Sequence, residues 1–144
     1  MANFLSGTWD LIGWRRIADN GSITYPLGED ARGLLIYADN GRMSVHMAAA
    51  NRAQVPGGDP LGGDAEARAG AYSTYLAYFG SYEIQGQNVV HHIDESLYPN
   101  WSDEKQVRPF TLESDQLVLH TPAMTLPDGT TAVNEMAWRR DPRR

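Results

Sequence analysis

The chain has 144 residues, carries a formal net charge of −6 and contains no cysteine. This length predicts one domain, residues 1–144, with a core that needs no disulfide or metal support. The missing cysteines exclude disulfide scaffolds, thiolate zinc sites and cysteine nucleophiles, and the acidic balance argues against a nucleic acid partner, which requires clustered Lys and Arg.

The sequence also lacks the patterns of membrane and secreted proteins. No apolar run approaches the roughly 20 residues of a membrane span, and the N-terminus lacks a basic segment followed by an apolar one. We therefore expect a soluble, cytoplasmic protein with no membrane partner. The oligomeric state stays open, with a homodimer as one option.

The first and last predicted strands, 7–17 and 132–140, carry aromatic and cationic residues that suit the end of a barrel. If these strands meet, Trp9 can plug one end of the barrel while a guanidinium from Arg139 or Arg140 stacks on its outer face. The other end would then be open to a ligand. The alternative is that the tryptophans are ordinary core residues of a β-sandwich.

Turn signals divide most of the chain into short segments. Ala-Asp-Asn-Gly occurs at 18–21 and again at 38–41, and Asn-Gly readily adopts the positive φ values of a tight hairpin. Further turn signals lie at 85–88, 113–115 and 127–129. We expect strands near 7–17, 22–25, 32–37, 42–48, 80–85, 88–96, 105–112, 116–121 and 132–140. This pattern predicts an all-β fold, an antiparallel up-and-down barrel.

One segment, from Asp64 to Phe79, predicts an inserted α-helix. Its apolar positions step by four, three, four and three: Ala65, Ala69, Tyr72, Leu76 and Phe79. The Gly- and Pro-rich segment 51–63 before it predicts a mobile hinge. The helix could act as a lid whose Tyr72 and Tyr75 contact a ligand, or as a fixed stopper of the barrel end.

All four histidines, His46, His91, His92 and His120, fall in predicted strands. Because strand neighbours point to opposite faces, only one of His91 and His92 can enter the barrel. A strand-borne metal site usually has ligands two residues apart, and no His-x-His occurs, so we expect no metal. The less favoured alternative combines His46, one of the paired histidines and a carboxylate. His46 and one paired histidine are candidate acid–base groups.

The strand at 105–112 places Gln106, Arg108 and Phe110 on one face. If this face is interior, Arg108 offers a fixed cation to a carboxylate, phenolate or enolate oxygen, and Gln106 adds an amide. If it is exterior, Arg108 is solvated. The aromatic loop before this strand predicts that Asn100 and Trp101 lie at the barrel rim, with ligand contact as a second role.

Several of these segments together resemble a known family. They are Gly7-Thr8-Trp9-Asp10-Leu11, Tyr25-Pro26-Leu27-Gly28, Arg32-Gly33-Leu34-Leu35-Ile36-Tyr37, Gly41-Arg42-Met43-Ser44, His91-His92-Ile93, Pro99-Asn100-Trp101 and Gln106-Val107-Arg108. In this order they resemble the small bacterial and fungal lipocalin-like domain family over nearly the whole chain. The resemblance implies a calycin-type barrel with a central cavity, and it favours His91 over His92 as the inward histidine.

Two functions remain open on this basis. The first is binding of a small, largely apolar ligand with an acidic or carbonyl oxygen. The alternative is a cofactor-independent isomerase, cyclase or dehydratase for a polyketide- or terpenoid-like intermediate, using His or Tyr as acid–base group and Arg108 for electrostatic stabilisation. A weaker third possibility is a haem-binding barrel of nitrobindin type. We place binding first, without a cofactor, because the spacing forces no catalytic pair.

The candidate catalytic residues are His91, His46 and Arg108, and the candidate ligand-binding residues are Gln106, Arg108, Phe110, Tyr72, Tyr75, Trp101 and Asn100.

Overall fold

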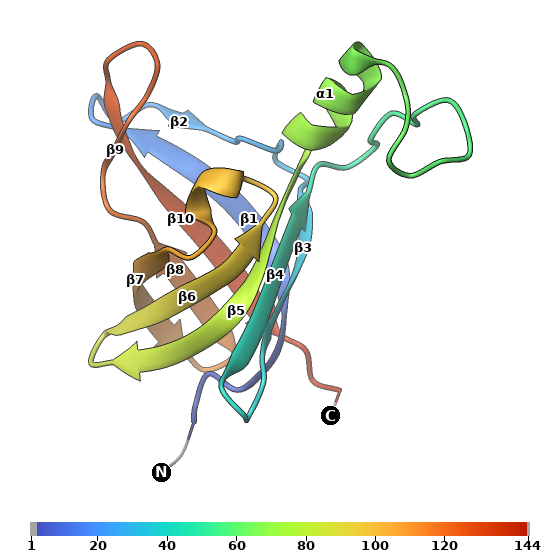
Figure 1. The fold of residues 1–144 in the computed structure, drawn as a ribbon. Helices are drawn as coiled ribbons and strands as arrows, with labels where there is room; N and C mark the ends of the chain where they lie inside the picture. The colour runs from blue at the N-terminus through green and yellow to red at the C-terminus, as the bar shows by residue number, and fades with distance from the viewer. Residues whose placement is uncertain (1–2, 144) are drawn as a thin grey trace.

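A computed structural model describes residues 3–143 of the chain. The elements in chain order are β1 (Gly7–Ala18), β2 (Ile23–Thr24), β3 (Arg32–Tyr37), β4 (Arg42–Ala48), α1 (Ala65–Ser73), β5 (Tyr75–Gln85), β6 (Asn88–Ser96), the 3-10 helix η1 (Pro99–Trp101), β7 (Lys105–Glu113), β8 (Gln116–His120), β9 (Met124–Thr125) and β10 (Thr131–Arg140). The strands form one antiparallel sheet that curls on itself (Figure 1).

Pairing between the first and last long strands closes the sheet into a barrel. β1 pairs with β3 on one side and with β10 on the other, from Trp9 opposite Arg140 to Ala18 opposite Ala132. The sheet contains ten strands, and the two-residue strands β2 and β9 lie outside the closed ring, which leaves eight. The predicted antiparallel barrel with adjacent end strands is confirmed.

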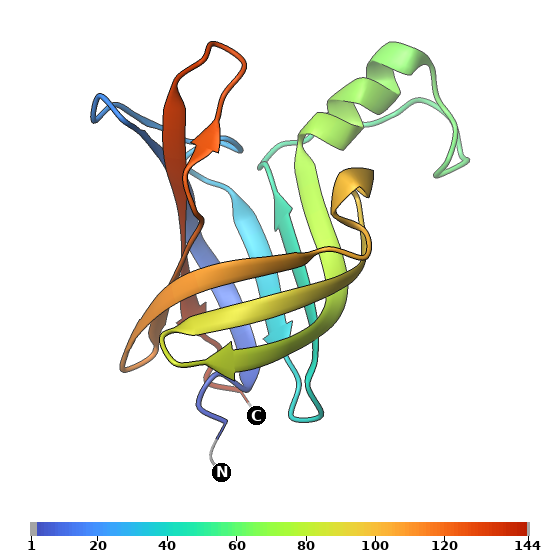
Figure 2. The ribbon, with the colours of Figure 1, turned by 60° about the vertical axis from the view of Figure 1, so that its left-hand side comes forward.

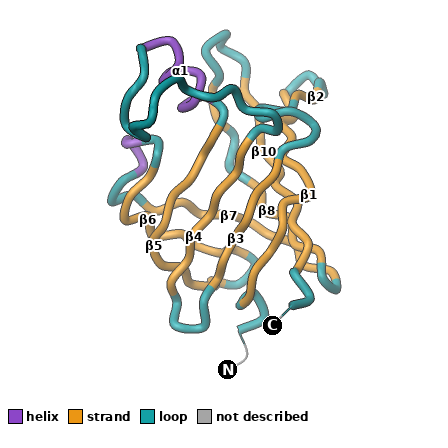
Figure 3. The backbone as a smooth tube through the Cα atoms, turned by 90° about the vertical axis from the view of Figure 1, so that its right-hand side faces the viewer, coloured by secondary structure: helices purple, strands orange, loops and turns teal. Residues whose placement is uncertain are grey.

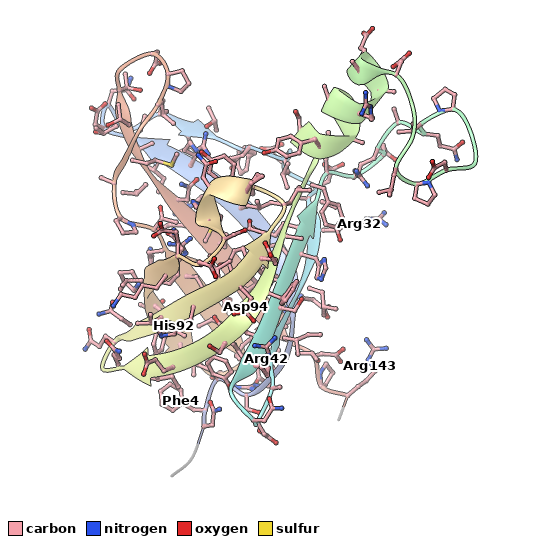
Figure 4. The ribbon with its side chains drawn as sticks, viewed as in Figure 1. Phe4, Arg32, Arg42, His92, Asp94 and Arg143 are labelled. Atoms are coloured by element: carbon pink, nitrogen blue, oxygen red, sulfur yellow. The ribbon has the colours of Figure 1, made fainter. Side chains whose placement is uncertain are left out.

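An aromatic plug closes the end of the barrel near the termini. Trp9 is 0% exposed, and its indole N–H donates to the carbonyl of Leu5 at 3.0 Å. The guanidinium carbon of Arg140 lies 4.2 Å from the centre of the Trp9 ring, and the same side chain donates to the carbonyls of Ser6 and Phe4. Phe4 is labelled at this end in Figure 4. The predicted plug is therefore present, with Arg140 as the stacked cation.

The predicted helix over 64–79 is wrong beyond its first ten residues. Asp64 caps α1 by accepting a hydrogen bond from the N–H of Ala67, and the helix ends before Thr74. β5 begins at Tyr75, which pairs with Ala48 of β4. The aromatic residues of this segment have high strand propensity, and the ladder with β4 buries alternate side chains, which overrides the helical spacing.

α1 does not cover the barrel as a stopper. None of its residues is buried, and Tyr72 is 47% exposed. Figures 2 and 3 show the helix projecting beyond the ends of β4 and β5, on the side of the barrel opposite the termini. Among residues 3–143, no helix is long and apolar enough to cross a membrane.

A β-bulge in β1 changes which residues face inward. The register of β1 against β10 shifts by one residue near the middle of the strand. Trp9 and Trp14 are therefore both buried, although they are an odd number of residues apart and an unbroken strand would place them on opposite faces. Beyond the bulge Arg16 faces the cavity, whereas Arg15 forms an ion pair with Glu135 on the outside.

Candidate ligand-binding site

The barrel encloses a cavity of about 510 Å³, which is within the usual range for small-molecule sites. Most of its wall is apolar, from residues such as Val45, Met47, Leu119, Met136 and Trp138. The polar side chains in the wall are Arg16, Tyr78, His91, Tyr98, Gln106, Arg108, Thr121 and Asn134. No acidic side chain from residues 3–143 lines this cavity, although the whole chain has a net charge of −6.

Arg108 is the most deeply buried cation of the cavity. Its side chain comes from β7 and is 4% exposed. One guanidinium N–H donates to the amide oxygen of Gln106, two residues earlier on the same face of the strand, at 3.2 Å. No carboxylate of the described chain lies within salt-bridge distance of Arg108. A buried cation without an anionic partner favours the binding of a negatively charged or strongly polarised oxygen.

His91 lies on β6, the strand next to β7, which carries Arg108, and its ring lies between two tyrosines. Its side chain is 1% exposed. Its Nε2 atom is 2.6 Å from the hydroxyl of Tyr37, and its Nδ1 atom is 2.6 Å from the hydroxyl of Tyr78. Tyr78 lines the cavity, whereas Tyr37 is fully enclosed. The three side chains form a chain of hydrogen bonds that ends at the cavity.

The direction of the two hydrogen bonds between Tyr37, His91 and Tyr78 follows from the number of protons available. Within the described chain the Tyr37 hydroxyl forms a hydrogen bond only with His91, so its proton is satisfied only if it donates to Nε2. The neutral imidazole then carries its proton on Nδ1 and donates it to the Tyr78 oxygen. The Tyr78 hydroxyl proton is consequently free to point into the cavity, next to Arg108.

The pKa values of these groups agree with this arrangement. Burial, together with the nearby Arg108 charge, lowers the pKa of His91 from its usual value to about 3. Burial raises the pKa of Tyr37 and of Tyr78, while Arg108 acts on both in the opposite direction. At neutral pH the group formed by Arg108, His91, Tyr37 and Tyr78 therefore contains one cation and three neutral hydrogen-bonding side chains.

The aromatic loop after β6 forms part of the cavity rim. Trp101 of η1 lines the cavity and packs edge-on against Tyr78, with ring centres 5.9 Å apart. Tyr98 also packs edge-on against Trp101, with ring centres 5.5 Å apart. The 3-10 helix therefore holds the indole of Trp101 over the inward-facing side of β5.

A second polar cluster lies on the opposite wall, where β1 meets β10. The side-chain oxygen of Asn134 accepts hydrogen bonds from the Trp14 indole at 2.9 Å and from Nε of Arg16 at 3.1 Å. Its side-chain nitrogen donates to the hydroxyl of Thr121 at 3.3 Å. Asn134 is buried and its oxygen is fully used, so it fixes the position of the half-buried Arg16 side chain.

Two predicted site residues lie on the outer face of the barrel. The inward side chains of β4 are Met43, Val45 and Met47, so the expectation that His46 enters the cavity is wrong. The Nδ1 atom of His46 is instead 3.0 Å from the hydroxyl of Tyr75, which is also excluded from the cavity because its position in β5 faces outward.

His91, rather than His92, is the inward member of the histidine pair. His92 bonds to Glu83 at 2.8 Å on the outside, where Figure 4 also shows Arg42 and Asp94.

Three other predicted residues lie away from the cavity wall. Phe110 packs near the plugged end, with its ring centre 6.1 Å from that of Phe4. Tyr72 is exposed on α1, and no residue of this helix lines the cavity. Asn100 is exposed and donates to the hydroxyl of Tyr98.

Of the sequence-derived candidates, the cavity contains Gln106, Arg108, His91 and Trp101. Their roles in binding or catalysis stay predictions.

Four important residues were missed by sequence reasoning: Arg16, Tyr37, Tyr78 and Asn134. Tyr78 was assigned to the helix, although the alternation of Tyr78, Gly80 and Tyr82 is a strand signal. Arg16 lies beyond the bulge, which the sequence does not mark. Tyr37 and Asn134 are ordinary inward positions of strands, and only the tertiary contacts distinguish them.

The site offers little to a metal or haem group. Within residues 3–143, no three His, Asp or Glu side chains gather closely enough to hold a metal ion. Both ring nitrogens of His91 are bonded to tyrosines, which leaves neither free to serve as an axial ligand of haem.

Comparisons with known proteins agree with the barrel architecture. A family model described as "Lipocalin-like domain" matches residues 6–141. A curated relative from Aspergillus oryzae, the 4'-hydroxy-3'-methoxypropiophenone carrier protein ppsC, is 29% identical over 109 residues, which cover 70% of this chain and 98% of the relative. No solved structure matches the chain at a significant level.

Proposed function

Because the chain belongs to the lipocalin-like domain family, we propose that it binds a small, largely apolar molecule whose acidic or carbonyl oxygen is held by Arg108. The observation that carries this proposal is the buried Arg108 guanidinium, which faces an apolar cavity without a carboxylate partner in the described chain. The ligand oxygen would be that partner.

The donors around Arg108 suit such an oxygen. Gln106 accepts one guanidinium hydrogen bond and thereby orients the group. The Tyr78 hydroxyl, whose oxygen accepts a hydrogen bond from His91, can donate a hydrogen bond to the same ligand oxygen. Two donors from β5 and β7 would then hold one oxygen while the apolar wall covers the rest of the molecule.

The name of the curated relative supports a carrier function. That protein is named for carrying 4'-hydroxy-3'-methoxypropiophenone, an aromatic ketone. A ketone has the carbonyl oxygen that the Arg108 site requires, and its aromatic ring matches the apolar wall. We therefore include aromatic ketones beside aromatic carboxylic acids among the probes.

The proposal is tested by comparing pairs of ligands that differ only in charge. We suggest 4-phenylbutanoic acid and its primary amide, with binding measured by tryptophan fluorescence, since Trp14, Trp101 and Trp138 line the cavity. Arg108→Met should weaken binding of the acid by about tenfold or more and that of the amide much less, because only a charge-assisted bond is lost. Arg42→Met, on the outer face, is the matched control and should change neither.

The opposite result has a clear form. If Arg108→Met weakens both ligands equally, the side chain contributes packing and the oxygen is held elsewhere. If 4'-hydroxy-3'-methoxypropiophenone and both phenylbutanoic ligands fail to bind the wild-type protein, the binding function itself is wrong.

Catalysis is a second candidate. The Tyr78 hydroxyl can donate a hydrogen bond into the cavity beside the Arg108 charge, and such an arrangement can stabilise an enolate. His91 would act only through Tyr78, since both of its nitrogens are engaged. The cavity offers no carboxylate from the described residues as a base. For this reason we rank carriage ahead of isomerase, cyclase or dehydratase activity.

Proton exchange separates the two candidates. NMR in D2O measures how fast the protons next to the carbonyl of 4'-hydroxy-3'-methoxypropiophenone exchange with solvent. A carrier leaves this rate at the buffer value. An enzyme accelerates it, and Tyr78→Phe would then remove the acceleration while the ketone still binds.

A further inference from the structure

We propose that Arg16 forms a second ligand-anchoring site in the same cavity, and that the ligand is an elongated apolar molecule with an oxygen acceptor at each end. This inference rests on the proposed function, because it assumes that Arg108 anchors one end. It adds a residue and a shape requirement that the Arg108 site alone does not provide.

The strand register places the two arginines across the cavity from each other. Arg16 on β1 pairs with Asn134 on β10, and the N–H of Thr121, just after β8, donates to the Asn134 carbonyl. Continuing the β7–β8 register from Phe110 opposite Leu119 brings Arg108 opposite Thr121. Arg16 and Arg108 therefore lie on one row, three strand steps apart in a ring of eight. At the usual strand spacing their backbones are about 14 Å apart along the wall, and the two side chains extend into the cavity from these positions.

Arg16 is held in place for binding rather than left free in solvent. Its Nε atom donates to the Asn134 oxygen, which also accepts the Trp14 indole proton. Because Asn134 in turn donates to Thr121, the cluster leaves little freedom for the base of the guanidinium. The Nη atoms of Arg16 have no recorded hydrogen bond within the described chain, so they remain available to a ligand.

The charges of the cavity support an acceptor at both ends. Both arginines line it, and neither has a carboxylate within salt-bridge distance among residues 3–143. The neighbouring Arg15, on the outside of the same strand, does have such a partner in Glu135 at 2.6 Å. Exposed arginines such as Arg32 and Arg68 also lack an ion pair within the described chain but are hydrated, whereas the two cavity arginines face a largely apolar space in which a ligand oxygen can supply the missing partner.

The ligand chemistry follows from this placement. One oxygen, ionised or carbonyl, meets Arg108 and Tyr78, and a second carboxylate or carbonyl meets Arg16. The segment between them crosses walls formed by Leu119, Met136 and Trp138 and is therefore apolar. A ligand with one polar end would leave Arg16 unused.

The test compares decanoic acid with decanedioic acid, which adds a second carboxylate to the same carbon chain. Tryptophan fluorescence gives the dissociation constants at neutral pH for the wild type and for Arg16→Met, Arg108→Met and Arg15→Met. The wild type should bind the diacid about tenfold more tightly than the monoacid, as expected for one charge-assisted bond. Arg16→Met should remove that difference, so that the two acids bind this variant with about equal affinity. Arg15→Met, the matched control, should keep the tenfold preference.

Other outcomes overturn the inference, and they distinguish it from the proposed function. If the two acids bind equally well to the wild type, or if Arg16→Met retains the diacid preference, the Arg16 site is wrong and the Arg108 site stands. If neither acid binds the wild type, the anion-binding function fails and the Arg16 site fails with it.

Discussion

At the scale of a single residue, His91 owes its chemical state to the side chains around it. In the unfolded chain a histidine is half protonated near pH 6.5. In the barrel, burial and the Arg108 charge lower its pKa to about 3, and two tyrosine hydroxyls occupy its ring nitrogens. The imidazole therefore serves as a neutral link in a hydrogen-bond chain rather than as a base.

This lowered pKa predicts a pH-dependent loss of stability. Between about pH 6.5 and 3 the unfolded chain binds a proton at His91 that the folded protein does not, so stability is complete above pH 6.5 and falls as the pH decreases. The contribution is about 1.4 kcal/mol per pH unit in this window. Urea unfolding of the wild type and of His91→Gln at pH 7 and pH 5 measures it. The wild type should lose more stability than the variant, and equal losses would contradict the prediction.

The sequence identified some site residues and missed others for reasons that are physical. Strand alternation predicted that Gln106 and Arg108 share one face of their strand, and that only one of His91 and His92 points into the barrel. It could not find Arg16, because the bulge in β1 reverses the alternation before that position. His46 failed for a different reason: period-two alternation states which residues share a face but not which face is inside.

At the scale of elements, the hairpins were predictable and the end of the helix was not. The Asn-Gly turns at 18–21 and 38–41 place Gly21 and Gly41 at φ values of 87° and 88°, as their sequence indicates. The α1–β5 boundary has no comparable signal, because apolar residues continue at helical spacing into the strand. Only the partner strand β4 decides the conformation there.

The register of β5 against β6 shifts between Phe79 and Gly80, and this second bulge gives a prediction about Gly80. A Cβ atom at this position would lie 1.9 Å from the backbone oxygen of His92, and backbone atoms cannot move aside as a flexible side chain can. Gly80→Ala should therefore lower the free energy of unfolding by at least about 2 kcal/mol. Gly70→Ala in α1 is the control, since nothing lies within 4 Å of its added methyl group, and it should be neutral or stabilising by up to about 1 kcal/mol. Similar losses in both variants, measured by urea unfolding, would contradict the clash.

The predicted hinge at 51–63 remains to be tested. The structure gives this segment no helix or strand, and α1 beyond it has no buried residue. We expect hydrogen exchange of amides in 51–63 to be faster than in β4 and β5 without ligand, and to slow when 4-phenylbutanoic acid fills the cavity if α1 closes as a lid. Protection that equals that of the strands in the empty protein would show a fixed segment.

At the scale of the whole molecule, a buried cation without an anionic protein partner opposes stability. Taking a guanidinium out of water without an anionic partner costs free energy, and an apolar side chain of similar size often relieves that cost. We therefore expect Arg108 to lower the free energy of unfolding of the protein without ligand.

A stability measurement tests this opposition. Arg108→Met should leave the free energy of unfolding of the empty protein unchanged or raise it by about 1 kcal/mol, while it weakens acid binding. Urea unfolding without ligand checks the first part and fluorescence titration the second. A loss of more than about 1 kcal/mol would mean that Arg108 stabilises the empty barrel through contacts of its own.

The bulge in β1 also has a consequence for comparing this chain with its relatives. The one extra residue acts as a phase change, since every position after it faces the opposite way from what counting from Trp9 implies. A relative with the same residues at 13–18 but one residue fewer before them would need no bulge, because plain alternation from Trp9 would already place the equivalents of Trp14 and Arg16 inside. A one-residue gap at this point of an alignment therefore indicates loss of the bulge, whereas substitutions at the positions of Trp14 and Arg16 would alter the cavity.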